Sequence, residues 1–127
     1  MTTYQDILGD TIPAHLEAQA EIPVLAGLQR QGDLIIIPRN IPMPTTAHIP
    51  TDGIPIIRGE NGGNTHLLIG DAHWAPNTAG NQSLGLMSVA STAYLVHPEH
   101  GAQGFAPGVY EIRRQREQAD QIRLVAD

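Results

Sequence analysis

The sequence predicts an all-β fold, built as a small β-sandwich or barrel and preceded by an N-terminal arm with one short helix. Short apolar runs rich in isoleucine, leucine and valine alternate with turns of glycine, proline and asparagine about every 8–12 residues, which is typical of sandwiches and barrels. Only one stretch is helical in pattern, whereas an α/β fold repeats helices of about 10–15 residues between its strands. A chain of 127 residues is expected to form one domain.

The composition limits the classes of protein that fit the chain. Apolar residues make up 41 % and aromatic residues 4 %, so the core is predicted to consist mainly of Ile, Leu, Val and Ala. Cysteine is absent, which excludes disulfides, thiolate metal sites and cysteine nucleophiles. No apolar run approaches the roughly 20 residues of a membrane span, and the N-terminus lacks the parts of a signal peptide. We therefore predict a cytoplasmic protein without membrane contact.

Arginine provides all of the positive side-chain charge. The net charge is −6, and none of the seven basic residues is a lysine. Arg113, Arg114, Arg116 and Arg123 lie near the C-terminus, where Glu111, Glu117, Asp120 and Asp127 balance them. Because phosphate contacts need net positive charge on one face, an acidic body with a neutral tail argues against nucleic acid as a partner.

Residues 1–28 are predicted to form the N-terminal arm, and residues 29–127 the β domain. Within the arm, Pro13 opens the helical stretch AHLEAQAE with Thr11 as its N-cap, and Ile22-Pro23 ends it. A helix of about nine residues is marginal alone and needs packing. Two surfaces are open as its support: the β domain of the same chain, or a neighbouring subunit.

The β domain is predicted from runs that are too short for helices. Leu34–Ile37 predicts a buried strand that Pro38 ends, and residues 38–55 form a proline-rich connector. Further strands are predicted at Ile54–Arg58, Leu67–Ile69, Leu84–Val96 (two short strands or one bulged strand), Val109–Arg116 and Ile122–Ala126. Glycine and proline predict a hairpin loop at Gly101–Gly108.

Three histidines form the candidate metal site. His97 and His100 lie three residues apart, and His66 follows a glycine-rich turn, so two strands of a small barrel would bring the three imidazoles together. Three neutral imidazoles with an open fourth position are a catalytic zinc or iron arrangement. A nearby carboxylate would come from Glu99, Glu60 or Asp71. The candidate cofactor is a divalent Zn²⁺, Fe²⁺ or Mn²⁺; the alternative is that these histidines are surface or turn residues hydrogen-bonded to the backbone.

The second candidate site is the strand Val109–Arg116. Period-2 alternation places Tyr110, Ile112, Arg114 and Arg116 on one face, and Val109, Glu111 and Arg113 on the other. Because Tyr110 and Ile112 mark the inner face, Arg114 and Arg116 need carboxylates, a ligand anion or another chain as partners. The candidate ligand or interface residues are therefore Glu99, Tyr110, Glu111, Arg113, Arg114 and Arg116; the alternative is a solvated charged strand end.

The C-terminal two thirds of the chain resemble a family of small bacterial and phage proteins. The matching segments are Gln31-Gly32-Asp33 before an apolar strand, His66 after a glycine turn, HPEHG at 97–101, PGVYEIRRQRE at 107–117 and VAD at 125–127. Asn64 stands where that family usually carries a second histidine. The resemblance implies a jelly-roll or cupin-like β fold, with residues 1–28 as an added arm.

Three functions are consistent with these features. The first is a non-enzymatic, self-assembling β domain that forms homo-oligomers and derives from a phage or mobile element. The second is a cupin-like metal-binding protein or metalloenzyme that uses His66, His97 and His100. The third is a small anion-binding domain that uses the cluster Arg113–Arg116. Glycine-rich nucleotide-binding motifs, a P-loop and a GxSxG motif are absent, so the sequence predicts no particular reaction.

Overall fold

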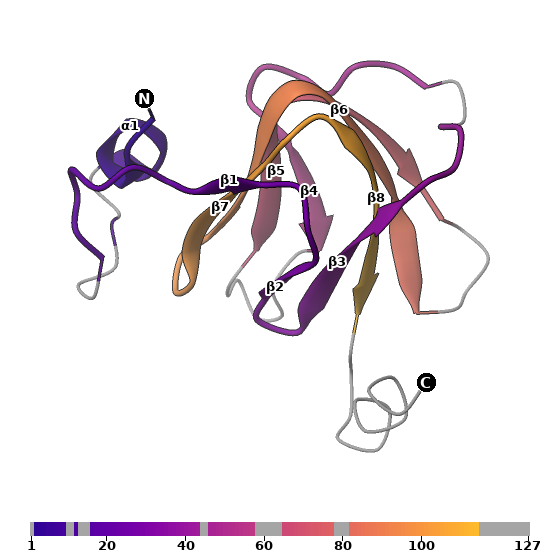
Figure 1. Cartoon of the computed structure of the whole chain (residues 1–127). Helices are drawn as coiled ribbons and strands as arrows, with labels where there is room; N and C mark the ends of the chain where they lie inside the picture. Colours follow the sequence, from indigo (N-terminus) through magenta and orange to yellow (C-terminus); the bar gives the residue numbers. More distant parts are fainter. Residues whose placement is uncertain are drawn as a thin grey trace.

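A computed structural model of the chain describes residues 2–9, 12, 16–43, 46–57, 65–77 and 82–114. Its body is a mainly antiparallel sheet that curls into a half-barrel, with a short helix at the N-terminus (Figure 1). The prediction of an all-β fold is confirmed. The elements are α1 (Tyr4–Leu8), β1 (Val24–Leu25), β2 (Gln29–Gln31), β3 (Leu34–Arg39), β4 (Ile54–Ile57), β5 (His66–Pro76), β6 (Ser83–His97), β7 (Gly101–Phe105) and β8 (Gly108–Arg114).

The apolar runs in the sequence correspond to strands β3, β4, β5, β6 and β8. The run predicted as either two strands or one is the single strand β6, and the register of its pairing with β5 shifts between Gly70 and Ala72. Strand β3 continues through Pro38 to Arg39 instead of ending before the proline. The short strands β1 and β2 were not predicted, and the predicted strand Ile122–Ala126 lies outside the described residues.

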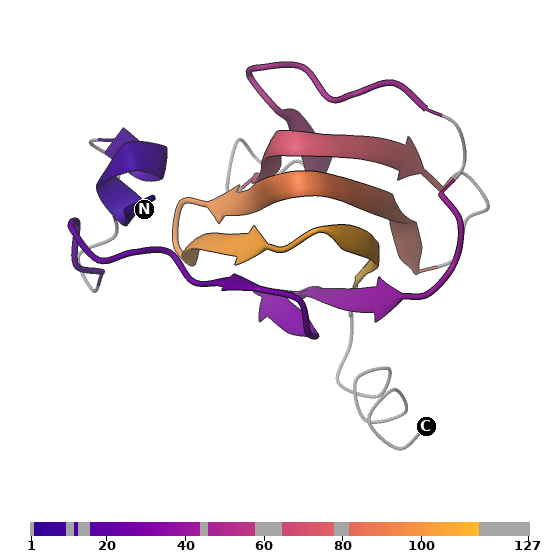
Figure 2. The same ribbon diagram turned by 45° about the horizontal axis from the view of Figure 1, so that its top comes forward.

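Strand β6 is the centre of the sheet. One of its edges pairs with β5 over most of the strand length, while the other pairs with β7 near its C-terminal end and with β8 near its N-terminal end. Figure 2 shows these strands side by side. Strands β7 and β8 therefore act as two halves of one return strand, interrupted at Ala106-Pro107. The predicted hairpin loop at Gly101–Gly108 is wrong, because the turn is confined to Pro98–His100 and residues 101–105 are the strand β7.

Glutamine side chains connect β2 to strands that its backbone does not pair with. Gln29 Nε2 donates to the Gly104 carbonyl at 2.9 Å, and Gln31 Nε2 donates to the Leu95 carbonyl at 2.9 Å. Gln103 Nε2 donates in the opposite direction, to the Arg30 carbonyl. We call these three residues the glutamine seam. The seam holds β2 against β6 and β7, where the curled sheet turns back on itself.

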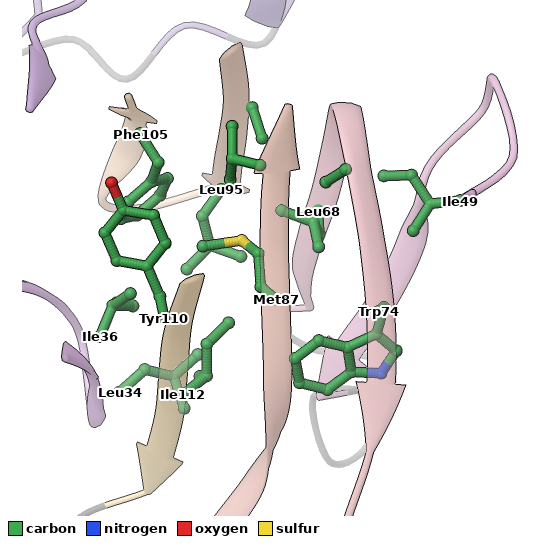
Figure 3. Close-up of a cluster of buried hydrophobic side chains, with 13 residues drawn as sticks. Leu34, Ile36, Ile49, Leu68, Trp74, Met87, Leu95, Phe105, Tyr110 and Ile112 are labelled. Carbon is green, nitrogen blue, oxygen red and sulfur yellow. The ribbon is translucent and has the colours of Figure 1, made fainter. Parts of the chain in front are cut away.

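The core lies on the concave face of the curled sheet (Figure 3). Alternate residues of β6 and β8 point inward, so Met87, Leu95, Tyr110 and Ile112 are buried together. Trp74 joins this cluster as a packing residue. Its ring requires a glycine at position 85, because a Cβ there would lie 2.8 Å from the ring carbons.

The helix of the arm lies earlier in the chain than the sequence predicts. Described residues 16–21 form a bend, a turn and a bridge from Glu21 to Thr3, whereas Thr11 and residues 13–15 lie outside the described residues. The Thr3 side chain accepts from the Asp6 N–H, and the Asp6 carboxylate accepts from the Thr3 N–H. This capping box satisfies amide groups that a short helix otherwise leaves without partners, which places α1 at Tyr4–Leu8.

The described part of the arm packs against its own β domain. Strand β1 pairs in parallel with β7, and the Gly104 N–H donates to the Pro23 carbonyl at 3.1 Å. The Leu16 side chain occupies the space where a Cβ at Gly101 would lie, so the glycine permits this contact. Of the two supports considered for the arm, the structure shows the one within the same chain.

Candidate functional site

The three histidines of the candidate metal site lie together at one end of the half-barrel. His66 is the first residue of β5, His97 is the last residue of β6, and His100 lies in the turn that follows. The ring centroids of His66 and His97 are 4.4 Å apart, and those of His97 and His100 are 4.6 Å apart. His66 and His97 are buried, whereas His100 is exposed. The cluster therefore extends from the interior of the protein to its surface.

The end of β2 and the turn that follows it add polar groups to this cluster. His66 Nδ1 lies 2.9 Å from Gln31 Oε1, and the Gln31 amide is oriented by its bond to the Leu95 carbonyl. Because Gln31 Oε1 only accepts, His66 Nδ1 is the donor and His66 Nε2 keeps its lone pair. That lone pair faces Asp33, whose Oδ1 lies 3.6 Å from Nε2. Arg114 Nε donates to the other oxygen of Asp33 at 3.0 Å.

His97 uses its ring differently. Its Nδ1 lies 3.0 Å from the Glu99 backbone nitrogen and 3.2 Å from that of His100, so it accepts from both amides. The proton of a neutral His97 ring is therefore on Nε2. With one nitrogen accepting from the backbone and the other protonated, His97 has no lone pair left for a metal ion. Its observed role is to hold the turn Pro98–His100.

Burial keeps the inner part of the cluster uncharged at neutral pH. Desolvation, followed by the charge of nearby His97, lowers the pKa of His66 from 6.5 to about 4. Desolvation also lowers the pKa of His97, with a further contribution from His100. Neutral imidazoles can act as acceptors or as metal ligands, whereas imidazolium rings cannot.

The described residues hold no set of three or more His, Asp or Glu side chains that already surrounds one point as metal ligands would. Asp71, one of the predicted carboxylates, instead contacts His48 and Ser91. Glu60 lies outside the described residues.

Asp33 and Gln31 belong to the cluster but were not among the predicted site residues. They reach His66 only because the sheet curls and the Gln31 side chain bonds to the end of β6, and the sequence separation of Gln31 from His66 is 35 residues. The sequence feature that could have identified them is the Gln-Gly-Asp segment before the strand β3, which places an amide and a carboxylate on either side of a glycine.

The structure separates the candidate residues of the strand β8. Tyr110 is buried in the core, and its hydroxyl donates to the Ala106 carbonyl at 2.7 Å. Glu111 and Arg113 point to the opposite face, where Glu111 accepts from Arg39 and Arg113. Glu99 lies in the turn after β6, and Arg116 lies outside the described residues.

The described arginines of this strand are engaged with carboxylates of the same chain. Arg113 pairs with Glu111 at 3.1 Å, and Arg114 pairs with Asp33 at 3.0 Å. An anion would have to compete with these pairs. A groove of about 400 Å³ lies beside Glu111, between Ile41, Ala75 and Leu86, and the ion pairs with Arg39 and Arg113 neutralise its carboxylate.

A second polar cluster lies on the β5–β6 surface. His48 Nε2 is 2.9 Å from Asp71 Oδ1, and Ser91 Oγ donates to Asp71 Oδ2 at 2.7 Å. This cluster has the composition of a Ser-His-Asp triad but not its geometry. Ser91 donates to the aspartate, whereas a nucleophilic serine must donate to the histidine.

The fold and the histidine cluster define a class: a small all-β protein whose curled sheet carries inward-facing histidines at one end. Within that class, the family model described as Domain of unknown function (DUF8820) matches residues 30–115, and the chain belongs to that family. The match covers all described strands from β3 to β8 and leaves the arm outside. Comparisons with curated proteins and with solved structures gave no match. No helix of the described residues is long and apolar enough to cross a membrane.

Proposed function

We propose that the protein is a non-enzymatic β domain that associates with further copies of itself. The observation that carries this proposal is the presence of three exposed large apolar side chains within residues 24–28, which we call the edge segment. Val24, Leu25 and Leu28 are 42 %, 50 % and 54 % exposed, and among the described residues only Ile41 joins them as an exposed large hydrophobic. Large apolar side chains that stay exposed within one short segment favour a protein contact.

The backbone of the edge segment supports the same proposal. Strand β1 pairs with β7 on one side and ends the order of the described sheet. An open strand edge carries N–H and C=O groups that can pair with another chain. Two copies related by a two-fold axis would place the same segment on both sides of the contact, which is the usual arrangement in homodimers.

The size of the edge segment predicts weak association. Stable interfaces bury about 800 Å² per partner, which is more than three side chains provide. The oligomer is therefore expected to form as concentration rises. Light scattering coupled to size exclusion tests this, with a mass above that of the monomer expected at high concentration.

A charge on the open edge should prevent this association, because natural edge strands use lysine to avoid pairing. Leu25→Lys is the test variant, and Ile41→Lys is the matched control, since Ile41 is similarly exposed but lies after β3. We expect Leu25→Lys to stay monomeric and Ile41→Lys to behave as the wild type. A wild-type chain that remains a monomer at hundreds of micromolar would disprove the proposal.

We also propose that the half-barrel is of the cupin-like kind. Its support is the position of His66 and His97, which point inward from neighbouring strands at one end of the curled sheet. An experimental structure would test this by showing whether β4 and β2 are bridged into a closed barrel. A jelly-roll strand order, a phage-related origin and a cytoplasmic location stay predictions from the sequence.

A further inference from the structure

Two hydrogen-bond acceptors face one another in the histidine cluster. His66 donates through Nδ1 to Gln31, so its Nε2 presents a lone pair, and the opposing group is Asp33 Oδ1. Their separation of 3.6 Å is longer than a hydrogen bond. A lone pair and a carboxylate oxygen repel one another unless a donor or a cation lies between them.

The separation of the two atoms suits a metal ion. A tetrahedral ion with bonds of about 2.0–2.2 Å holds two of its donor atoms about 3.3–3.6 Å apart. The observed 3.6 Å between His66 Nε2 and Asp33 Oδ1 lies at the upper end of that range. A small contraction of the exposed turn that carries Asp33 would complete the bonds.

His100 is the nearest further candidate for a third donor. A Cβ at Gly32 would lie 3.1 Å from His100 Nε2 and 3.4 Å from His66 Cε1, so the glycine keeps open the space between these rings. His100 is exposed, and its ring can rotate toward that space. This rotation is needed because the described side chains do not yet converge as three ligands.

Outer residues already orient the two fixed donors. Gln31 Oε1 accepts a hydrogen bond from His66 Nδ1–H. The ring nitrogen of a metal-ligating histidine that does not bind the metal commonly donates such a bond. Arg114 holds Asp33 Oδ2 at 3.0 Å and leaves Oδ1 directed at His66. The arrangement of donors is thus two imidazoles and one carboxylate, a set that suits iron, zinc and manganese.

We propose that a divalent cation such as Zn²⁺, Fe²⁺ or Mn²⁺ binds between His66 Nε2 and Asp33 Oδ1, with His100 as the third protein ligand. This ligand set contains Asp33 in place of His97. Water or a small-molecule ligand would fill the remaining positions of the ion. The site is separate from the edge segment, so it stands or falls independently of self-association.

The test is a titration of untagged, chelator-treated full-length protein with Zn²⁺ alone, in competition with a chromophoric chelator. We expect one equivalent to bind. Asp33→Asn and His66→Gln should each weaken the affinity at least about tenfold, because each removes a ligand whose outer partners alone are worth about 10–100-fold. His48→Gln is the matched control, since His48 also lies beside an aspartate, in the other polar cluster.

Two further measurements keep the result decisive. Far-UV circular dichroism tests whether each variant folds. If His66→Gln does not fold, Asp33→Asn still tests the site, because it changes only a half-exposed turn residue. On addition of Zn²⁺, the ¹⁵N chemical shift of His66 Nε2 should change as expected for a metal-bound nitrogen. The shift of His97 Nδ1 should not. Less than a tenth of an equivalent of bound zinc, unchanged affinity in Asp33→Asn, or loss of binding in His48→Gln would each overturn the proposal.

Discussion

At the scale of single residues, His48 and Asp71 form an exposed pair whose ionisation is linked. His48 Nδ1 donates to the Ile49 carbonyl at 2.7 Å, and that bond together with Asp71 raises the pKa of His48 above 6.5. Hydrogen bonds from Ser91 and His48 lower the pKa of Asp71. A raised pKa means that the folded chain binds the proton more tightly than the unfolded chain. The stabilisation of the folded chain by protonated His48 is therefore complete below pH 6.5. It is lost as pH rises through the folded pKa of His48.

An NMR titration of the His48 ring checks this linkage. We expect its midpoint above 6.5 in the wild type and a lower midpoint in Asp71→Asn, which removes the charge but keeps an acceptor. Asp52→Asn, in the exposed turn before β4, is the control and should leave the midpoint in place. An unchanged midpoint in Asp71→Asn would show that the aspartate does not contribute.

The individual residues also show how far sequence reasoning reaches into the candidate site. The positions of His66, His97 and His100 led to one of two alternatives, that the rings gather, and the ring centroids of His66 and His97 and of His97 and His100 do lie 4.4 and 4.6 Å apart. The sequence did not reveal that His97 Nδ1 accepts two backbone amides, because that bond depends on the shape of a turn. Asp33 was missed for a related reason, since it approaches His66 only after the sheet curls.

At the scale of elements, one hydroxyl forms a hydrogen bond at the interruption between β7 and β8. Pro107 has no N–H, and the Ala106 carbonyl at this break accepts from Tyr110 Oη at 2.7 Å. Tyr110→Phe removes that donor and should lower the free energy of unfolding by about 1 kcal/mol. Urea denaturation measures the change. Tyr94→Phe, on the outward-facing side of β6, is the control and should change it by less than about 0.5 kcal/mol.

The prediction of strands succeeded where side-chain alternation decides and failed where glycine was counted as a turn. Tyr110 and Ile112 are buried on one face of β8, as the period of two requires. In β7, Gly101 and Gly104 made the segment resemble a loop. Gly101 admits Leu16 of the arm, and a Cβ at Gly104 would lie 2.8 Å from Val24. These glycines therefore permit close packing by the arm, which a local pattern does not reveal.

At the scale of the whole molecule, the spacing of apolar runs and turns predicted the all-β class but not the shape of the sheet. The curl requires β2 to meet β6 and β7, and this contact is made by side chains of the glutamine seam and not by a backbone ladder. Glutamine in a strand is an ordinary polar residue when only the sequence is known. Its burial at positions 29 and 31 becomes evident only when the carbonyls of Gly104 and Leu95 are in place.

The glutamine seam should therefore contribute measurably to the stability of the fold. Gln29→Ala and Gln31→Ala each remove a buried amide, and each leaves a carbonyl without that donor, so each should cost about 1–3 kcal/mol of unfolding free energy. Because both bonds hold the same strand, the double variant should deviate from additivity by about 0.5 kcal/mol or more. Urea denaturation of the four chains gives this coupling. Gln19→Ala, an exposed glutamine of the arm, is the control and should change stability by less than about 0.5 kcal/mol. Additive losses no larger than that of the control would mean that β2 is held by its pairing with β3 alone.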